Sequence, residues 1–162
     1  MEFTIRPMAE SDRQRLVEVS LAADRLFALA GVRLPPDDPG LMLDRCSPVL
    51  VAGRPPVGLA ALTVLDGDAH LEQIAVRPDH GRRGLGTALL EAACARAREL
   101  GHRRITLTTF RDLPWNAPWY ARHGFAVLAE SEWGPQLAEQ WREEAETGIA
   151  VLPRVVMRRE LG

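Results

Sequence analysis

Hydrophobic positions near the start of the chain follow the period of a strand and then that of a helix. Residues Phe3 to Arg6 alternate between apolar and polar side chains, which predicts a short strand. Ser11 or Asp12 is suited to cap a helix whose apolar positions run from Leu16 to Ala30. Gly31 follows directly and supplies a helix stop. The pattern therefore predicts a strand followed by one amphipathic helix.

Three apolar runs then follow one another at strand length. The runs Val49–Ala52 and Val57–Leu65 are separated by a Gly-Arg-Pro-Pro turn, which favours an antiparallel hairpin. Asp66-Gly67-Asp68 is a second turn signal of the kind found in short hairpin loops. It leads into a third run, residues 69–76. The three runs predict consecutive strands of one meander.

Helical spacing returns after this meander. Leu85, Leu89, Leu90, Ala93, Ala97 and Leu100 share one broad face, and Gly101 provides the stop. Residues Arg104 to Thr109 then read as a strand. A strand, a helix and a strand in this order predict a β-α-β crossover and a parallel strand pair.

Weaker signals predict the remaining elements. Pro118 cannot lie deep inside a helix that starts near Asp112, so the helix there is expected to begin at the cap Asn116 and to end at Gly124. The other expected elements are a short helix over 41–46 after a proline-rich segment, a strand over 125–128, a helix over 134–148 and a strand over 149–157. The fold class is mixed α/β, or α+β.

Composition limits the possible functions. A chain of 162 residues with 46% apolar side chains is expected to form a single domain, residues 1–162, with a buried core. A net charge of −2 favours neither nucleic acid nor an anionic membrane as partner. No apolar run approaches the roughly 20 residues that span a bilayer, and no signal peptide precedes the first strand, so we expect a cytoplasmic protein. Cys46 and Cys94 form no metal-type motif with histidine, which predicts buried free thiols and no metal site.

The stretch that joins the third strand to the helix at Leu85 carries the candidate chemistry. Its turn is Gly81-Arg-Arg-Gly-Leu-Gly86, and a helix begins within it. Amide N–H groups in the first turn of a helix lack intrahelical partners and carry partial positive charge. Glycines allow a phosphate to approach the main chain closely, and His80, Arg82 and Arg83 add donors around the same corner. The sequence therefore predicts a pyrophosphate-binding corner.

Two motifs together resemble the GNAT superfamily of N-acetyltransferases, which transfer the acetyl group of acetyl-coenzyme A to a primary amine. One is Ile74-Ala-Val-Arg-Pro-Asp-His-Gly-Arg-Arg-Gly-Leu-Gly-Thr-Ala-Leu-Leu90, and the other is Trp119-Tyr-Ala-Arg-His-Gly-Phe125. A Gly-x-Gly turn alone would be weak evidence. The resemblance covers most of the chain and implies a central, twisted, mostly antiparallel sheet of about six to seven strands flanked by helices, with a β-α-β coenzyme-binding core.

The resemblance also implies roles for particular residues. Acetyl-coenzyme A would be the co-substrate, its pyrophosphate held by main-chain amides and side chains of the turn and its pantetheine arm paired with the strand before it. Tyr120 would protonate the departing thiolate, a task for which a phenol is one of the few suitable side chains. The expected coenzyme contacts are Ile74, Ala75, Val76, Arg82, Arg83, Gly84, Leu85, Gly86, Thr87 and Asn116.

This chain departs from the family pattern at two positions. Gly81 stands where the family usually has Gln or Arg, and Arg82 and Arg83 are available to replace that contact. Thr108 stands where many members carry a glutamate that serves as the base for the incoming ammonium. An alkyl ammonium has a pKa of about 10.4, so some group must remove a proton before attack. Glu72 is the first candidate, Asp112 the second, and a bound water remains an alternative.

Other interpretations stay open. Glu72 is equally well explained as an inert acid on the solvent face of its strand, and Tyr120 as a packing residue. His70 and His123 are interpreted as surface residues, the four tryptophans as packing residues, and Glu139 to Glu146 as a solvated helix face, with a lid or a dimer contact as the alternative. The acceptor would be a small-molecule amine or a protein amino group. The walls of the acceptor site would come from the first helix, the segment 35–46 and the residues after Phe125.

Two other function classes compete with the enzyme. The first is a non-catalytic module that binds or senses acyl-coenzyme A, which the missing glutamate and Gly81 would suit. The second is a nucleotide-binding α/β domain. The turn lacks the Gly-Lys-Ser/Thr ending of such phosphate loops, which argues against that class.

Overall fold

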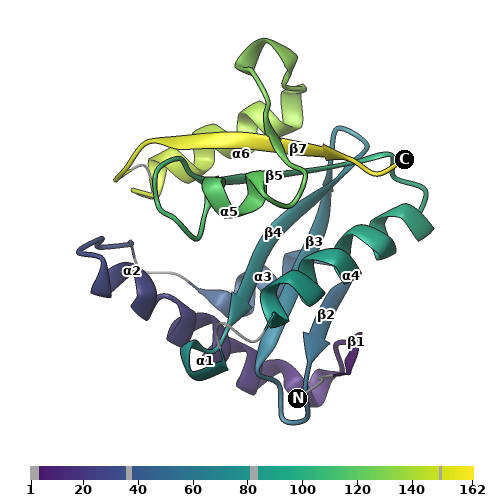
Figure 1. The fold of residues 1–162 in the computed structure, drawn as a ribbon, viewed down its shortest axis with the longest axis vertical. Coiled ribbons are helices and arrows are strands. Elements are labelled where there is room, and N and C mark those ends of the chain that lie inside the picture. Colours follow the sequence, from purple (N-terminus) through teal and green to yellow (C-terminus); the bar gives the residue numbers. More distant parts are fainter. Residues whose placement is uncertain (1–3, 36–37, 81–83, 150) are drawn as a thin grey trace. The chain divides into compact units, whose positions relative to one another are not determined.

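The strands form one mixed sheet. A computed structural model of the chain describes residues 4–35, 38–80, 84–149 and 151–162. Over these residues seven strands are ordered β1-β2-β3-β4-β5-β7-β6, and helices flank the sheet (Figure 1). The sheet is mostly antiparallel, which confirms the predicted fold class. The chain divides into two compact units, residues Met1–Thr63 with Leu71–Arg96 and residues Val64–His70 with Ala97–Gly162.

The first unit holds the meander and the helix that follows it. Its elements are β1 (Ile5–Pro7), η1 (Glu10–Asp12), α1 (Arg13–Ala23), α2 (Arg25–Leu29), α3 (Pro39–Arg45), β2 (Val49–Ala52), most of β3 (Gly58–Leu65), the end of β4 (Asp68–Val76), η2 (Pro78–His80) and most of α4 (Leu85–Glu99). Strands β2 and β3 pair antiparallel, which confirms the predicted hairpin, and β1 pairs antiparallel with β2.

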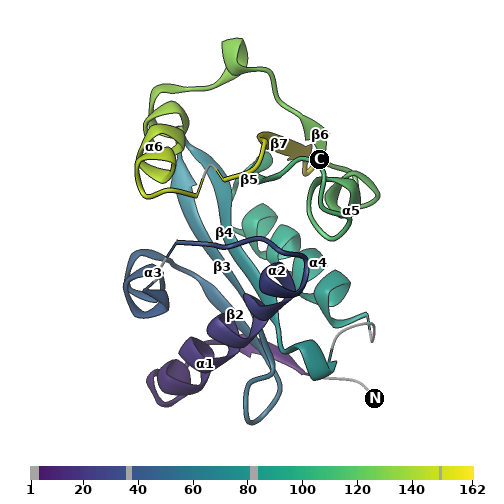
Figure 2. The same ribbon diagram turned by 90° about the vertical axis from the view of Figure 1, so that its left-hand side faces the viewer.

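Alternating side chains on β3 separate the two faces of this part of the sheet. Leu59 and Ala61 belong to a buried cluster with residues of α1 and α3, whereas Gly58 meets Leu89 of α4. Successive residues of a strand point to opposite faces, so α1 and α3 cover one face and α4 covers the other. Figure 2 shows this arrangement around β2 and β3.

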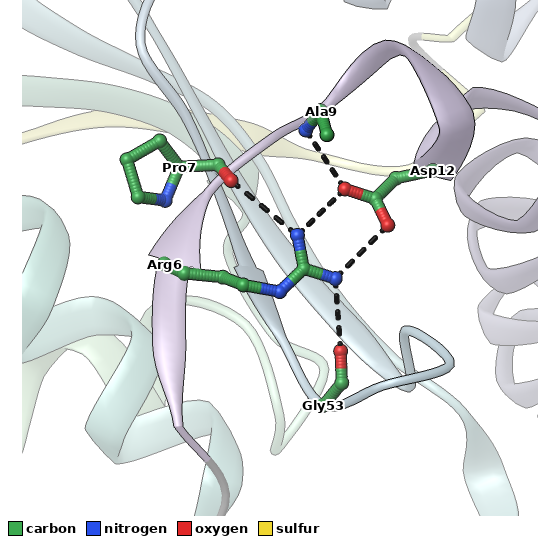
Figure 3. A network of polar contacts seen from close by, with 5 residues as sticks. All are labelled: Arg6, Pro7, Ala9, Asp12 and Gly53. Carbon is green, nitrogen blue, oxygen red and sulfur yellow. Dashed lines mark hydrogen bonds and ion pairs between the residues drawn. The ribbon is translucent and has the colours of Figure 1, made fainter.

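A buried ion pair ties β1 to the start of α1. The Arg6 guanidinium donates to both Asp12 carboxylate oxygens, at 2.7 and 2.9 Å, and to the Gly53 carbonyl at 3.1 Å (Figure 3). The Ala9 N–H also donates to Asp12, at 2.8 Å. Asp12 does occupy the position before α1, but its carboxylate makes no bond to that helix. The expectation of a side-chain cap by Asp12 was therefore wrong, because the buried guanidinium is the stronger partner.

The predicted first helix is divided in two. It breaks at Asp24, between α1 and α2, and Gly31 ends the second part with a φ of +79°. Helix α1 buries Leu16, Val19 and Ser20, whereas α2 buries none of its residues. The apolar period continues through both helices, but tertiary packing supports only the first.

Helix α4 has the length that its apolar period predicted, with one error at its end. Leu89, Leu90 and Ala93 are fully buried, and Cys94 and Cys46 are buried free thiols, as expected. Leu100 was expected on the packed face but is 48% exposed, because the helix ends at Glu99 and Leu100 lies beyond its last turn.

The second unit contains the C-terminal half of the fold and the turn between β3 and β4. Its further elements are β5 (Arg104–Phe110), α5 (Ala117–Ala121), β6 (Ala126–Val127), η3 (Glu130–Glu132), α6 (Pro135–Glu146) and β7 (Arg154–Glu160). Strands β4 and β5 pair in parallel through Ala69 with Ile105 and His70 with Thr106, which confirms the predicted crossover. Strand β7 pairs antiparallel with β5 and with β6.

Three strand boundaries differ from the predictions. The first strand covers 5–7 rather than 3–6, and Phe3 lies outside the described residues. The strand expected over 125–128 pairs only at Ala126 and Val127. The last strand begins at Arg154 rather than at Ile149, because Pro153 has no N–H to donate to a neighbouring strand.

Asp66, in the turn between β3 and β4, caps α6 although the two lie far apart in the sequence. Its carboxylate accepts from the N–H groups of Gln136 and Leu137, at 2.9 and 3.0 Å. The Gln136 side chain accepts from the Asp66 N–H in return, at 2.6 Å. This reciprocal pair resembles a capping box, but its two members are 70 residues apart.

Helix α6 packs on a small apolar cluster of the second unit. Leu137 lies with Leu128 and Val156, and the Trp141 ring stacks on Trp133 with centroids 4.9 Å apart. The guanidinium of Arg154 lies 4.0 Å above Trp141. The solvated-face interpretation therefore holds for Glu139, Glu143 and Glu146, which are exposed, but not for Glu144, which pairs with Arg154 at 3.1 Å.

His70 is buried, which corrects its interpretation as a surface residue. It is 1% exposed, and its Nδ1 lies 2.8 Å from the Thr106 hydroxyl. Its Nε2 lies 3.2 Å from the amide nitrogen of Gln140 on α6. Since an amide nitrogen only donates, Nε2 accepts and the ring proton is on Nδ1. Burial lowers the pKa of His70 to about 4. The surface prediction failed because α6 covers β4 at this point.

Asp12 should contribute far more to stability than a matched exposed acid. We expect Asp12→Ala to lower the free energy of unfolding by about 1.5–3 kcal/mol, since it leaves the Arg6 guanidinium without its charged partner. The pKa of Asp12 is lowered to about 2, mainly by the Arg6 hydrogen bonds, so the wild-type contribution is full above pH 3.8 and is lost as the pH falls through 2. Asp44→Ala is the control, because Asp44 also pairs with an arginine at 2.7 Å but is 57% exposed. Urea denaturation measures both, and equal losses would contradict the prediction.

His70 should make stability fall between pH 6.5 and 4. The unfolded histidine takes up a proton near pH 6.5, whereas the folded one resists protonation until the pH reaches about 4. The wild type should therefore lose up to about 3 kcal/mol across this window, and it should be fully stabilised above it. His70→Gln should flatten this pH dependence, whereas His102→Gln should leave it in place. If stability depends on pH in the same way in His70→Gln as in the wild type, His70 is not the group responsible.

Candidate functional site

The end of β4 and the start of α4 flank the turn for which the sequence predicts an anion-binding corner. The Arg77 N–H donates to the Val57 carbonyl at 2.9 Å, η2 follows, and α4 begins at Leu85. Within the described residues, the Ala88 N–H donates to the Gly84 carbonyl at 3.0 Å. Gly84 has a φ of +74°, and a Cβ built on it would meet no atom of the described residues within 4 Å. The main chain is therefore approachable at this corner, with first-turn amides of α4 beside it.

The predicted coenzyme-binding residues of the first unit lie on two consecutive elements. Ile74, Ala75 and Val76 form the last part of β4, and Gly84 to Thr87 open α4. Ala75 and Leu85 are buried, Ile74, Val76 and Gly86 are half-buried, and Gly84 and Thr87 are exposed. Arg82 and Arg83, together with Gly81, lie outside the described residues.

A polar contact between α1 and β4 was not anticipated. The Gln73 carboxamide donates to the Ser20 hydroxyl at 2.9 Å, and its oxygen lies 3.2 Å from that hydroxyl. Ser20 is completely buried and stands one helical turn after Leu16 on the packed face of α1. A polar residue on an otherwise apolar helix face is the signal that could have identified it. The contact joins α1 to the strand residue directly before Ile74.

The two candidate bases have different surroundings. Glu72 lies half-buried on β4. Burial of the Cys46 thiol raises its pKa to about 12, and the charge of Glu72 adds to this rise. Asp112 is exposed and accepts two bonds from Arg111, each of 3.0 Å. These bonds lower the pKa of Asp112. A carboxylate held by a guanidinium is a weaker proton acceptor, so the geometry favours Glu72 of the two.

Tyr120 lies in α5 among other aromatic rings. Its ring meets Trp119 edge-on at a centroid distance of 5.0 Å and Phe125 at 5.6 Å. The Trp119 ring also lies 4.2 Å from that of His123, whose Nδ1–H donates to the Trp119 carbonyl at 2.8 Å. Burial raises the pKa of the Tyr120 phenol, so the hydroxyl is protonated at neutral pH. These edge contacts fix the ring in one orientation.

Helix α5 starts where the sequence predicted. Asn116 is the residue before it, and Pro118 lies in its first turn. The Asn116 side chain makes no capping bond, but its carbonyl accepts from the Tyr120 N–H at 3.0 Å. Gly124 ends the turn with a φ of +88°. Asn116 therefore holds Tyr120 through the main chain.

The family of the chain follows from a comparison of its sequence. Residues 21–125 match the model of the family described as acetyltransferase (GNAT) family. The chain belongs to this family. The matched range contains β4, the turn, α4, β5 and α5, so it includes both motifs on which the resemblance rested. The GNAT assignment made from the sequence is confirmed.

Solved structures with low sequence identity share the GNAT fold. An N-acetylglutamate synthase from Neisseria gonorrhoeae, solved with coenzyme A and N-acetyl-glutamate, superposes with a TM-score of 0.77 at 19% identity. It matches 100% of this chain, which spans 36% of its length. A GNAT acetyltransferase from Staphylococcus aureus Mu50 matches at 0.75 and 18% identity, and the PaiA N-acetyltransferase from Thermoplasma acidophilum, solved with coenzyme A, at 0.69 and 16%. For both, 99% of each chain is covered.

Two further features are absent from the described ranges. No group of three or more His, Cys, Asp or Glu residues there is placed to hold a metal ion. No described helix combines the length and the apolar character needed to cross a bilayer.

Gly58 should control how α4 sits on the sheet. A Cβ at this position would lie 2.9 Å from Leu89 Cδ1 and 3.2 Å from the Ala75 carbonyl. We expect Gly58→Ala to cost about 1–3 kcal/mol of unfolding free energy, because the helix must move away from β3. Since the same helix opens at the anion-binding corner, coenzyme A should also bind more weakly.

Gly40→Ala serves as the control for Gly58→Ala. Gly40 lies in the first turn of α3, where a Cβ would meet, among the described residues, the ends of the Arg13 and Asp38 side chains at 3.2 Å. Alanine favours a helix over glycine, so this variant should be neutral or more stable. Denaturant melts and coenzyme titrations of both variants test the pair, and a fully stable Gly58→Ala with normal affinity would refute the prediction.

Proposed function

We propose that the chain is an acetyl-coenzyme A-dependent N-acetyltransferase that acts on a primary amine by direct attack. The family match carries the proposal, and it includes the strand, turn and helix that form the anion-binding corner. Two structural neighbours were solved with coenzyme A, which supports the same donor for this chain. We also propose that residues 1–162 act as one acetyltransferase domain.

The donor would be held mainly by main-chain groups. We assign the pyrophosphate to the amides between Arg82 and Thr87 and the pantetheine arm to the edge of β4 at Ile74 to Val76. The open space beside Gly84 supports this assignment, because a side chain there would stand in the way of the phosphates. Asn116 is retained as a further coenzyme contact from the family resemblance.

In the proposed reaction the amine nitrogen attacks the thioester carbonyl carbon. A C–N bond forms and the C–S bond breaks. The nitrogen loses two protons, one from the ammonium before the attack and one from the tetrahedral intermediate. The coenzyme thiolate accepts one proton, and the other is released to solvent. An amide and a free thiol result. Because the alkyl ammonium has a pKa of about 10.4, a base or a directed water must act before the attack.

Tyr120 is the proposed proton donor to the thiolate. A phenol has an ordinary pKa of about 10 and carries its proton at neutral pH, as a general acid requires. The edge contacts with Trp119 and Phe125 support a fixed direction for the hydroxyl. A positioned donor stabilises the transition state in which negative charge develops on sulfur.

Glu72 is the proposed base, acting directly or through a water. Its half-buried place on β4, two residues before Ile74, supports this role. Asp112 is less suited because Arg111 holds its carboxylate in the charged form. Thr108, where many members of the family carry the base, has no titratable group in the neutral range.

Tyr120→Phe tests the proposed mechanism, because it removes the hydroxyl and keeps the ring. We expect kcat for thiol release to fall by about 10²–10⁴-fold, since a general acid acts in the transition state. The rise in melting temperature caused by acetyl-coenzyme A should be unchanged, which separates chemistry from binding. A rate and a pH–rate profile equal to those of the wild type would remove Tyr120 from the mechanism.

Melting temperatures and thiol release together separate the competing functions. Acetyl-coenzyme A should raise the melting temperature of the wild type, and adenosine triphosphate should do so weakly or not at all. Equal shifts from the two ligands would favour a nucleotide-binding domain. A shift from acetyl-coenzyme A without thiol release from any amine would favour a non-catalytic acyl-coenzyme A-binding module.

A further inference from the structure

Helix α5, which carries Tyr120, is too short to be stable through its own hydrogen bonds. It consists of five residues, Ala117–Ala121. Isolated helices shorter than about 12–15 residues are marginal in water, so a helix of this length depends on contacts made at its ends and by its side chains. Those contacts therefore decide how the Tyr120 ring is oriented.

The residues directly after α5 close its C-terminal end. The last carbonyls of a helix have no partner within the helix itself. The Tyr120 carbonyl accepts from the N–H groups of His123 and Phe125, at 2.9 and 3.2 Å. The Trp119 carbonyl accepts from the side chain of His123, whose Nδ1 lies 2.8 Å away. Since a carbonyl oxygen only accepts, the ring proton is on Nδ1, and His123 acts as a side-chain cap of α5.

The imidazole of His123 also lies against the Trp119 ring. The two ring centroids are 4.2 Å apart, and the ring planes are inclined by 34°. The Trp119 ring in turn meets the Tyr120 ring edge-on, with an angle of 79° between the planes. The prediction that His123 is a surface residue holds only in part, because the residue is half-buried. His123 thus contacts Trp119 at two points, the carbonyl and the indole.

The second ring that contacts Tyr120 is held differently. Phe125 is 4% exposed, and its ring lies 5.6 Å from that of Tyr120. A buried ring is fixed by the close packing around it. Trp119 is only half-buried, so packing alone restrains it less. The two contacts from His123 supply the restraint that Trp119 would otherwise lack.

We propose that His123 is a positioning residue for Tyr120. It caps α5 and stacks on Trp119, and Trp119 then keeps the Tyr120 hydroxyl in one direction. The effect on the reaction rate rests on the proposed function, in which Tyr120 gives its proton to the coenzyme thiolate. His123 itself exchanges no proton with the substrate and acts only through Trp119.

The position of the Tyr120 ring can be observed without turnover, because the chain contains one tyrosine. Tyrosine labelled with carbon-13 in the ring gives NMR resonances that belong to Tyr120 alone, and they depend on how the neighbouring indole is placed. We expect these resonances to move in His123→Ala. His102→Ala is the matched control, because the His102 Nδ1 also lies 3.0 Å from a main-chain carbonyl, that of Gly67. Tyr120 resonances that stay in place in a folded His123→Ala would overturn the proposal.

Reaction rates test what the contact does for catalysis. His123→Ala should lower kcat for thiol release roughly tenfold, which is part of what a well-placed general acid supplies. The rise in melting temperature caused by acetyl-coenzyme A should be unchanged, and His102→Ala should keep the wild-type rate. His123→Asn should recover most of the loss, because its amide can place an N–H where Nδ1 stands in the wild type. If His123→Asn is as slow as His123→Ala, the hydrogen bond to Trp119 is not what positions Tyr120.

The Tyr120→Phe background separates positioning from a general loss of structure. If His123 acts through the Tyr120 hydroxyl, His123→Ala should cause no further fall in kcat once that hydroxyl is absent. A further tenfold fall in the double variant would show that His123 acts on another part of the site, and would overturn the proposal.

The two kinds of measurement also separate this inference from the proposed function. Tyr120 resonances that move in His123→Ala, without thiol release by the wild type from any amine tested, would support the positioning contact and overturn the acetyltransferase proposal. Thiol release that falls in Tyr120→Phe but is equal in the wild type and His123→Ala would overturn the positioning role and leave the acetyltransferase proposal standing.

Discussion

The contact between Gly58 of β3 and Leu89 of α4 is the constraint on which the anion-binding corner depends. The absent side chain lets the helix lie against the strand, with the Ala75 carbonyl of β4 also within 3.2 Å of where a Cβ would stand. The helix is long and its inner face is fully buried, so its axis cannot tilt without opening the core. The first-turn amides of α4 are thereby held at the end of β4, beside the open main chain at Gly84.

Polar groups anchor the less regular parts of both units. Asp12 and Arg6 join β1 to the start of α1, and Asp66 caps α6 from the turn between β3 and β4. His70 connects Thr106 on β5 with Gln140 on α6. The Asp12 carboxylate, the two terminal nitrogens of Arg6 and both ring nitrogens of His70 are hydrogen-bonded where they are removed from water, which offsets the cost of burying them. Apolar packing would hold these elements together without specifying their ends, and the polar contacts define where each begins.

Helices α1 and α2 show how one apolar period can serve two purposes. The first part, around Leu16, is packed on the sheet, and Ser20 bonds to Gln73 at its end. The second part buries nothing, and the chain turns back at Gly31 to leave a pocket with Arg33, unpaired within the described residues, at its wall. Apolar side chains that do not join a core are available to bind a small apolar molecule.

The sequence alone determined the order and type of the elements, the parallel β4–β5 pair and the family, because these depend on local periodicity and on motifs that are continuous in the chain. It also predicted an anion-binding corner, whose glycines and helix start are neighbours in sequence. It did not reveal the burial of His70, the cap that Asp66 gives to α6, the partner of Asp12 or the pocket at Arg33. Each of these depends on side chains far apart in the chain or on which helix face meets the sheet. Only the tertiary structure decides those contacts, since periodicity shows that a face is apolar but not what covers it.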